Sequence, residues 1–179
     1  YKGIFTTLSS CASRQLEEVT FRRATISVPE LMATAGKYFR KVYKGNKAHI
    51  DFKIQPLEGR ITGDWNQLRF LLENLIDEAC SVTLDGAVCL SAREDGEFIR
   101  FLFTDMRREK TREELNQLFY PDLSRMTAGE KGELYGTEYL VCKQIIRDHD
   151  EFAGRRGCRI NAEPGKEGGF TIYFTLPKK

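Results

Sequence analysis

The feature that most constrains the fold is a long apolar stripe between residues 64 and 81. Large aliphatic residues and one alanine recur there at the spacing of a single helix face, namely Leu68, Leu71, Leu72, Leu75, Ile76 and Ala79. Asp64, with Gln67 three residues later, is typical of a helix N-cap. A stripe this continuous has to be buried, so the rest of the chain must supply a layer that covers it.

Two more long helices and one short helix are predicted. One long helix covers about residues 28–44, where Ser27 can cap the first turn and Pro29 lies within it. The other covers about residues 137–148, and a capping box opens the short helix over 111–119. Each long helix carries an apolar face, so all three are expected to pack on a common surface.

Strands supply that surface. Segments rich in β-branched and aromatic residues, most of them alternating apolar with polar residues, predict strands over residues 21–26, 49–54, 87–92, 98–104, 158–162 and 170–176. Turns at Glu94-Asp95-Gly96 and Pro164-Gly165 join the last four segments into two hairpins. We therefore predict a two-layer α/β (α+β) sandwich, in which a mixed, largely antiparallel sheet carries the three long helices on one face.

Composition excludes several functional classes. The net charge of +2 is too small to indicate nucleic acid or a membrane surface as a partner. The five cysteines are odd in number and lack a CxxC spacing, which favours reduced, partly buried thiols over disulfides or a zinc site. Cys80 and Cys142 are interpreted as core residues rather than nucleophiles. We expect the domain to work in the cytoplasm, as a fragment of a longer protein.

Four segments resemble, in order and spacing, the conserved boxes of histidine kinase ATP-binding domains. They are the Asp-x-x-x-Leu and Asn-Leu pattern within residues 63–79, Leu-Phe-Tyr-Pro at 118–121, the helix at 139–146, and the closing hairpin at 157–177. The resemblance covers about residues 16–177 and implies the histidine-kinase-like ATPase (GHKL) fold. It also implies that residues 17–179 form this domain and that residues 1–16 are a linker or the tail of a dimerisation helix.

The resemblance implies specific nucleotide contacts, and the chain departs from them. The family's second N-box asparagine helps to hold magnesium, and Glu78 stands there, whereas Asn74 matches the family pattern. In the first glycine box Asp105 matches the aspartate that binds adenine, but Arg107 and Glu109 replace the two glycines. Glycine serves where the backbone must come close to a ligand, so these replacements are expected to obstruct the pocket.

The second glycine box and the phosphoacceptor depart in the same way. Of three family glycines only Gly136 remains, with Leu134 and Glu138 at the other two positions. Neither histidine is on a dimerisation helix: His49 lies on a predicted strand, and His149 lies at a helix end, where a structural role is expected. No catalytic residue is predicted.

Three interpretations remain open. The first is a degenerate ATP-binding domain without kinase activity or cofactor, which serves as a signalling or scaffolding module of a larger protein. The second is a working kinase domain that binds Mg-ATP through Asn74, Glu78, Asp105 and Gly136, with Glu78 as the metal ligand. The third is a pocket that Arg107 and its neighbour have adapted to another anion. In each case we expect protein partners or a homodimer through the preceding helix, no nucleic acid, and no membrane contact by this fragment.

Overall fold

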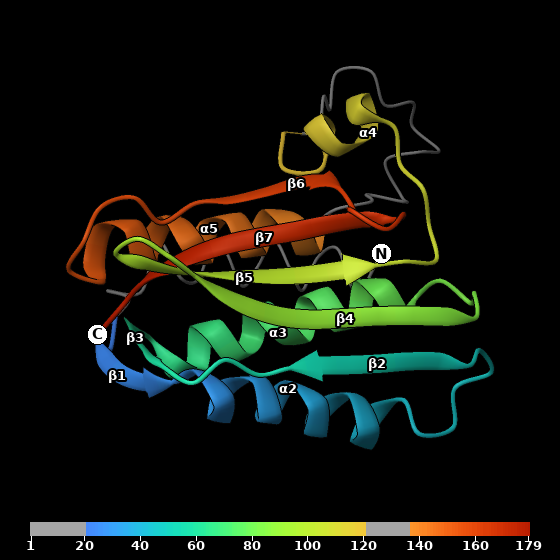
Figure 1. The fold of residues 1–179 in the computed structure, drawn as a ribbon, viewed down its shortest axis with the longest axis horizontal. Helices are drawn as coiled ribbons and strands as arrows, with labels where there is room; N and C mark the ends of the chain where they lie inside the picture. The colour runs from blue at the N-terminus through green and yellow to red at the C-terminus, as the bar shows by residue number, and fades with distance from the viewer. Residues whose placement is uncertain (1–20, 121–136) are drawn as a thin grey trace.

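A five-stranded sheet forms one layer of the molecule, with the long helices on one face (Figure 1). The computed structural model describes residues 21–120 and 137–179. The sheet order is β2-β4-β5-β7-β6, built from β2 (Ile50–Gln55), β4 (Gly86–Asp95), β5 (Phe98–Asp105), β7 (Phe170–Pro177) and β6 (Ile160–Pro164). Only β2 and β4 pair in parallel, and the other three pairings are antiparallel. The predicted mixed, largely antiparallel sandwich is confirmed.

The helices begin where their caps predict. α2 (Val28–Val42) is capped by Ser27, α3 (Trp65–Cys80) by Asp64, and the short α4 (Arg112–Gln117) by the reciprocal Thr111–Glu114 box. α5 (Thr137–Phe152) extends one turn beyond the predicted end near residue 148. The expectations for residues 1–16 lie outside the described residues.

The predicted stripe of α3 is the centre of the core. Its six apolar residues are buried to 1% exposure or less. They face a sheet whose inner side carries the stacked rings of Phe101 and Phe174, whose centroids lie 5.0 Å apart. Burial raises the pKa of the Cys80 thiol to about 11, so that thiol is protonated at neutral pH. Cys80 and Cys142 are both buried, as expected for core cysteines.

Two short strands form a separate sheet that the sequence did not indicate. β1 (Ala24–Ser27) pairs antiparallel with β3 (Arg60–Gly63), outside the main sheet. The first strand was predicted over residues 21–26, and the observed strand begins three residues later. The pairing brings the starts of α2 and α3 together, because each of the two strands leads directly into one of these helices or its cap.

His149 locks the start of α3 to α5, which agrees with its expected structural role. The imidazole is fully buried; Nε2 accepts a hydrogen bond from the Asp64 N–H at 3.0 Å, and Nδ1 donates to the Ile145 carbonyl at 2.8 Å. Gly63 is required beside it, because a Cβ there would lie 2.9 Å from Leu68 and 3.0 Å from the ring. Among the described residues, no helix is long and apolar enough to cross a bilayer.

Truncation in the core stripe should be costly. Leu71 is fully buried, and Leu71→Ala should lower the free energy of unfolding by about 2–5 kcal/mol because it leaves a cavity under the sheet. Leu84→Ala is the control: its side chain is 45% exposed, so we expect a change of about 0.5 kcal/mol or less. Urea unfolding followed by circular dichroism measures both, and equal effects would contradict the core assignment.

Candidate functional site

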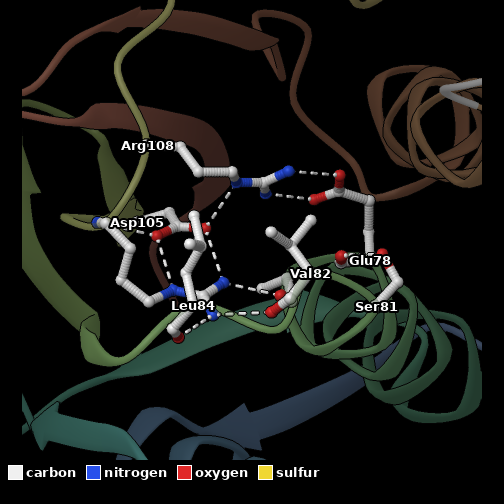
Figure 2. Close-up of polar contacts among 8 residues, drawn as sticks. Glu78, Ser81, Val82, Leu84, Asp105 and Arg108 are labelled. Atoms are coloured by element: carbon white, nitrogen blue, oxygen red, sulfur yellow. Dashed lines mark hydrogen bonds and ion pairs between the residues drawn. The ribbon is translucent and has the colours of Figure 1, made fainter. Parts of the chain in front are cut away.

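Two of the residues that the family resemblance assigns to nucleotide binding, Glu78 and Asp105, lie close together where β5 ends beside the C-terminus of α3. Figure 2 shows Asp105 at this point, with Glu78 on the last turn of α3 and the segment through Ser81, Val82 and Leu84 between them. Asp105 is buried, with 1% of its surface exposed. A charged group at such a depth requires compensating partners, and here two arginines supply them.

Arg107 is inserted into this space. Its side chain is fully buried and all five guanidinium N–H donors have acceptors. Nε and Nη2 donate to the two carboxylate oxygens of Asp105 at 3.0 and 2.9 Å. The remaining donors go to backbone carbonyls just after α3 and at its end, namely those of Ala79, Val82 and Leu84. The Arg107 side chain therefore connects the end of β5 to the end of α3 through hydrogen bonds.

Asp105 has no acceptor position left. Oδ1 accepts from the backbone N–H and from Nε of Arg107, both at 3.0 Å. Oδ2 accepts from Nη2 of Arg107 and from Nε of Arg108 at 2.9 and 3.0 Å. A carboxylate offers about four lone-pair sites, and four donors occupy them here.

Arg108 carries the connection on to Glu78. Nη1 and Nη2 of Arg108 donate to the two carboxylate oxygens of Glu78 at 3.1 and 2.9 Å, a bidentate pair. The Phe170 ring lies 5.3 Å below the guanidinium, which adds a cation–π contact. Both side chains are mostly buried, at 14% and 16% exposure. The four charges of Arg107, Arg108, Asp105 and Glu78 sum to zero, and we call these residues the arginine cluster.

Gly86 makes room for the Arg107 side chain. Its φ of +138° is one that glycine adopts readily, and a Cβ there would lie 2.7 Å from Cγ of Arg107. The glycine opens β4 directly beside the end of β5. The backbone at β4 is thus compatible with a long side chain entering from the neighbouring strand.

The pKa shifts follow from this packing. Burial alone would raise the pKa of Asp105, but hydrogen bonds from Arg107 and the charges of both arginines outweigh it, and the pKa is lowered from its usual 3.8. Burial opposes the charge of Arg108 as well, yet the Glu78 carboxylate dominates and raises its pKa. Both shifts favour the charged forms of Asp105 and Arg108.

The other predicted site residues lie elsewhere. Nδ2 of Asn74 donates to the Phe70 carbonyl on its own helix at 2.7 Å. The sequence suggested that Glu109 would obstruct the pocket. Instead its carboxylate accepts a hydrogen bond from the Gly169 N–H at 2.8 Å and so holds the β6–β7 turn. Gly136 lies outside the described residues. No group of three or more potential metal ligands was found among residues 21–120 and 137–179.

Sequence reasoning missed two parts of the site. The backbone carbonyls that receive Arg107 have no sequence signal. Tyr139 on α5 was assigned only to a helix, yet it is buried beside Glu78, and burial followed by that charge raises the pKa of its hydroxyl. The apolar position of Tyr139 at the start of a helix gave no indication of a polar neighbour.

Comparison with known proteins identifies the family. Residues 63–179 match the model of the histidine kinase-, DNA gyrase B- and HSP90-like ATPases. The chain belongs to this family. Over 138 residues it is 30% identical to the adaptive-response sensory kinase SasA of Thermosynechococcus vestitus. The aligned region covers 75% of this chain and 34% of that kinase. The chain therefore spans about a third of the length of this curated relative, and it corresponds to the ATP-binding domain of a sensor histidine kinase.

Solved structures show the same fold at lower identity. The nucleotide-free catalytic domain of the histidine kinase ThkA superposes with a TM-score of 0.66 at 18% identity, covering 88% of this chain and 96% of that one. The Acinetobacter baumannii histidine kinase AdeS gives 0.68 at 13%, covering 97% and 76%. Full-length ShkA in complex with AMPPNP gives 0.72 at 17%, covering 98% and 35%.

The arginine cluster does not fit the nucleotide contacts that the family implies. Asp105 has no free acceptor for an adenine amino group, and each oxygen of Glu78 accepts a hydrogen bond from Arg108. The guanidinium of Arg107 likewise has all of its donors bonded within the protein. In this arrangement the carboxylates bind the protein's own side chains.

Removal of the Arg107 side chain should strongly destabilise the domain. Arg107→Ala leaves Asp105 buried with one cationic partner and frees three carbonyls, so the free energy of unfolding should fall by about 3–5 kcal/mol. Arg100→Ala is the matched control, because Arg100 pairs with Asp95 near the surface and should change stability by about 1 kcal/mol or less. Chemical denaturation decides, and an Arg107→Ala protein as stable as the control would contradict the geometry.

Acid should weaken the cluster selectively. The pKa of Asp105 is lower in the folded chain than in the unfolded chain, where it is about 3.8. The ionised carboxylate therefore contributes fully to the free energy of unfolding above about pH 5, and this contribution is lost as the pH falls through the lowered pKa of the folded state. The stability difference between the wild type and Asp105→Asn should therefore be largest near pH 7 and shrink below about pH 4. Denaturation curves at several pH values measure this difference; a gap that widens on acidification would contradict the ion pairs.

Proposed function

We propose that this domain does not bind Mg-ATP and serves as a signalling or scaffolding module of a larger protein. The observation that carries the proposal is the saturation of Asp105 by Arg107 and Arg108. Adenine recognition through this carboxylate would require breaking buried, charge-assisted hydrogen bonds first. Each such bond contributes about 1.5–3 kcal/mol, and every 1.4 kcal/mol is tenfold in affinity.

The magnesium position supports the same proposal. Release of Glu78 for a metal ion would strand Arg108 in a mostly buried position, with only the shared Asp105 as a counter-charge. A released Glu78 without bound magnesium would repel a triphosphate by roughly 3 kcal/mol at 5 Å and an effective dielectric near 20. Both costs oppose the same ligand. They add to the loss of the glycines that would bring the backbone close to it.

The cluster also explains how the domain keeps its shape without a nucleotide. A ligand at 100 times its dissociation constant would add about 2.7 kcal/mol to stability. Here an internal cluster joins β5 to α3 through the protein's own side chains, which would hold the two elements together without a ligand. Such a domain is suited to hold a fixed surface for a protein partner. The ThkA kinase has been crystallised in complex with the response regulator TrrA, and we propose a protein partner here as well.

Calorimetric titration with Mg-ATP tests the proposal. We expect no saturable heat and a dissociation constant above about 1 mM, which corresponds to a binding free energy weaker than about −4.1 kcal/mol. Thermal unfolding with and without Mg-AMPPNP gives a second measurement, and we expect the midpoint to stay unchanged. ShkA, which was crystallised with AMPPNP, is the positive control for ligand quality.

Binding with a dissociation constant below about 100 μM would overturn the proposal and favour a working kinase with divergent contacts. A crystal with adenine on Asp105 and magnesium on Glu78 would do so directly. In that case Asn74→Ala and Glu78→Gln should each weaken binding, and autophosphorylation would become the next assay.

A further inference from the structure

A second polar site lies away from the arginine cluster, at the C-terminal end of α2. A cavity of about 680 Å³ is lined there by the cations Lys37, Arg40, Lys41 and Lys44, together with Asn46 and Tyr43. None of its lining residues belongs to the arginine cluster. Its volume falls within the range of about 300–1,000 Å³ that is typical of small-molecule sites.

The exposed end of α2 carries several cations close together. Lys37, Arg40 and Lys41 lie on α2, where Lys37 is one helical turn from each of the other two, and Lys44 follows two residues after the helix ends. Such like-charged neighbours destabilise a helix by about 0.2–0.5 kcal/mol each. The helix dipole favours cations in the last turn, which accounts for Arg40 and Lys41 but not for Lys37.

No described acidic side chain neutralises these cations. None of the four forms an ion pair within residues 21–120 and 137–179. The nearby carboxylates are engaged elsewhere. Asp51 pairs with Lys53, Asp77 accepts from the Tyr43 hydroxyl at 2.5 Å, and Asp85 accepts from the His49 N–H at 2.8 Å.

One wall of the cavity is preorganised. The Tyr43 ring stacks on Phe39, with centroids 6.0 Å apart, and its hydroxyl is fixed on Asp77, which also accepts from Tyr38 at 2.7 Å. Burial, followed by the hydrogen bond to Asp77, raises the pKa of the Tyr43 hydroxyl, so the phenol remains neutral. The phenol itself therefore adds no negative charge, and its aromatic surface is held in place.

We propose that this cavity binds a small, multiply charged phosphate compound. Four cations within one cavity match three or four negative charges, and arginine and lysine are the usual phosphate ligands. The site is independent of the family's nucleotide pocket, so it stands whether or not the domain binds Mg-ATP.

Titration with sodium triphosphate, without magnesium, tests the proposal. At about 50 mM salt we expect a dissociation constant below about 1 mM, with weaker binding at about 200 mM salt because of screening. The double variant Lys37→Ala, Lys41→Ala should bind at least about tenfold more weakly, a loss of about 1.4 kcal/mol. In amide-resolved NMR spectra, the Asn46 side-chain signals should shift during the titration.

A matched control separates the cavity from net charge. The pair Lys53→Ala, Arg93→Ala removes two cations that lie outside the cavity on β2 and β4, and binding should stay within about twofold after correction for screening. Equal losses in the two double variants would overturn the proposal, and so would no binding by the wild type. Tighter binding of polyglutamate than of triphosphate would also overturn it, because the site would then favour an acidic protein segment.

Discussion

The ion pairs of Asp105 are the interaction on which the geometry of the candidate site depends. The carboxylate ends the central strand β5 and is too deep to be solvated, so it remains charged only because Arg107 and Arg108 surround it. Replacement of such a cluster by apolar residues of similar volume could be neutral, whereas loss of one member leaves a charge stranded. The cluster therefore fixes a specific arrangement more than it adds net stability.

Arg107 is effective because its acceptors belong to three different segments. Asp105 lies on the sheet, the Ala79 carbonyl on the last turn of α3, and the Val82 and Leu84 carbonyls on the connection to β4. The end of a helix leaves carbonyls without intrahelical partners, and a planar guanidinium can satisfy several at once. A lysine could not reproduce this set, since it has three donors on a single nitrogen.

The sequence predicted most of the fold because periodicity reports burial directly. The apolar stripe at 64–81 predicts a helix with one buried face, and the alternation at 49–54 predicts a half-buried strand. The structure has both, as α3 and β2. The site was less predictable. The exchange of glycine for Arg107 indicated an obstructed pocket, but the side chain could have pointed to solvent, and its burial depends on the Gly86 backbone and on carbonyls that carry no sequence signal. Glu109 was misplaced for the same reason, because its partner is the backbone N–H of Gly169.

Glu78 and Arg108 make better sense together than apart. Viewed alone, a glutamate at the position of the family's magnesium asparagine adds a charge beside a triphosphate, and an arginine after the first glycine box adds bulk. In the structure the two form a bidentate pair, and with Arg107 and Asp105 the charge is balanced within one buried cluster. Independent losses would leave unpaired charges at several points of the pocket, each opposed by desolvation. Mutual neutralisation instead leaves each carboxylate paired: Arg108 lies between Asp105 and Glu78, and the cluster joins the strand and the helix that carry them.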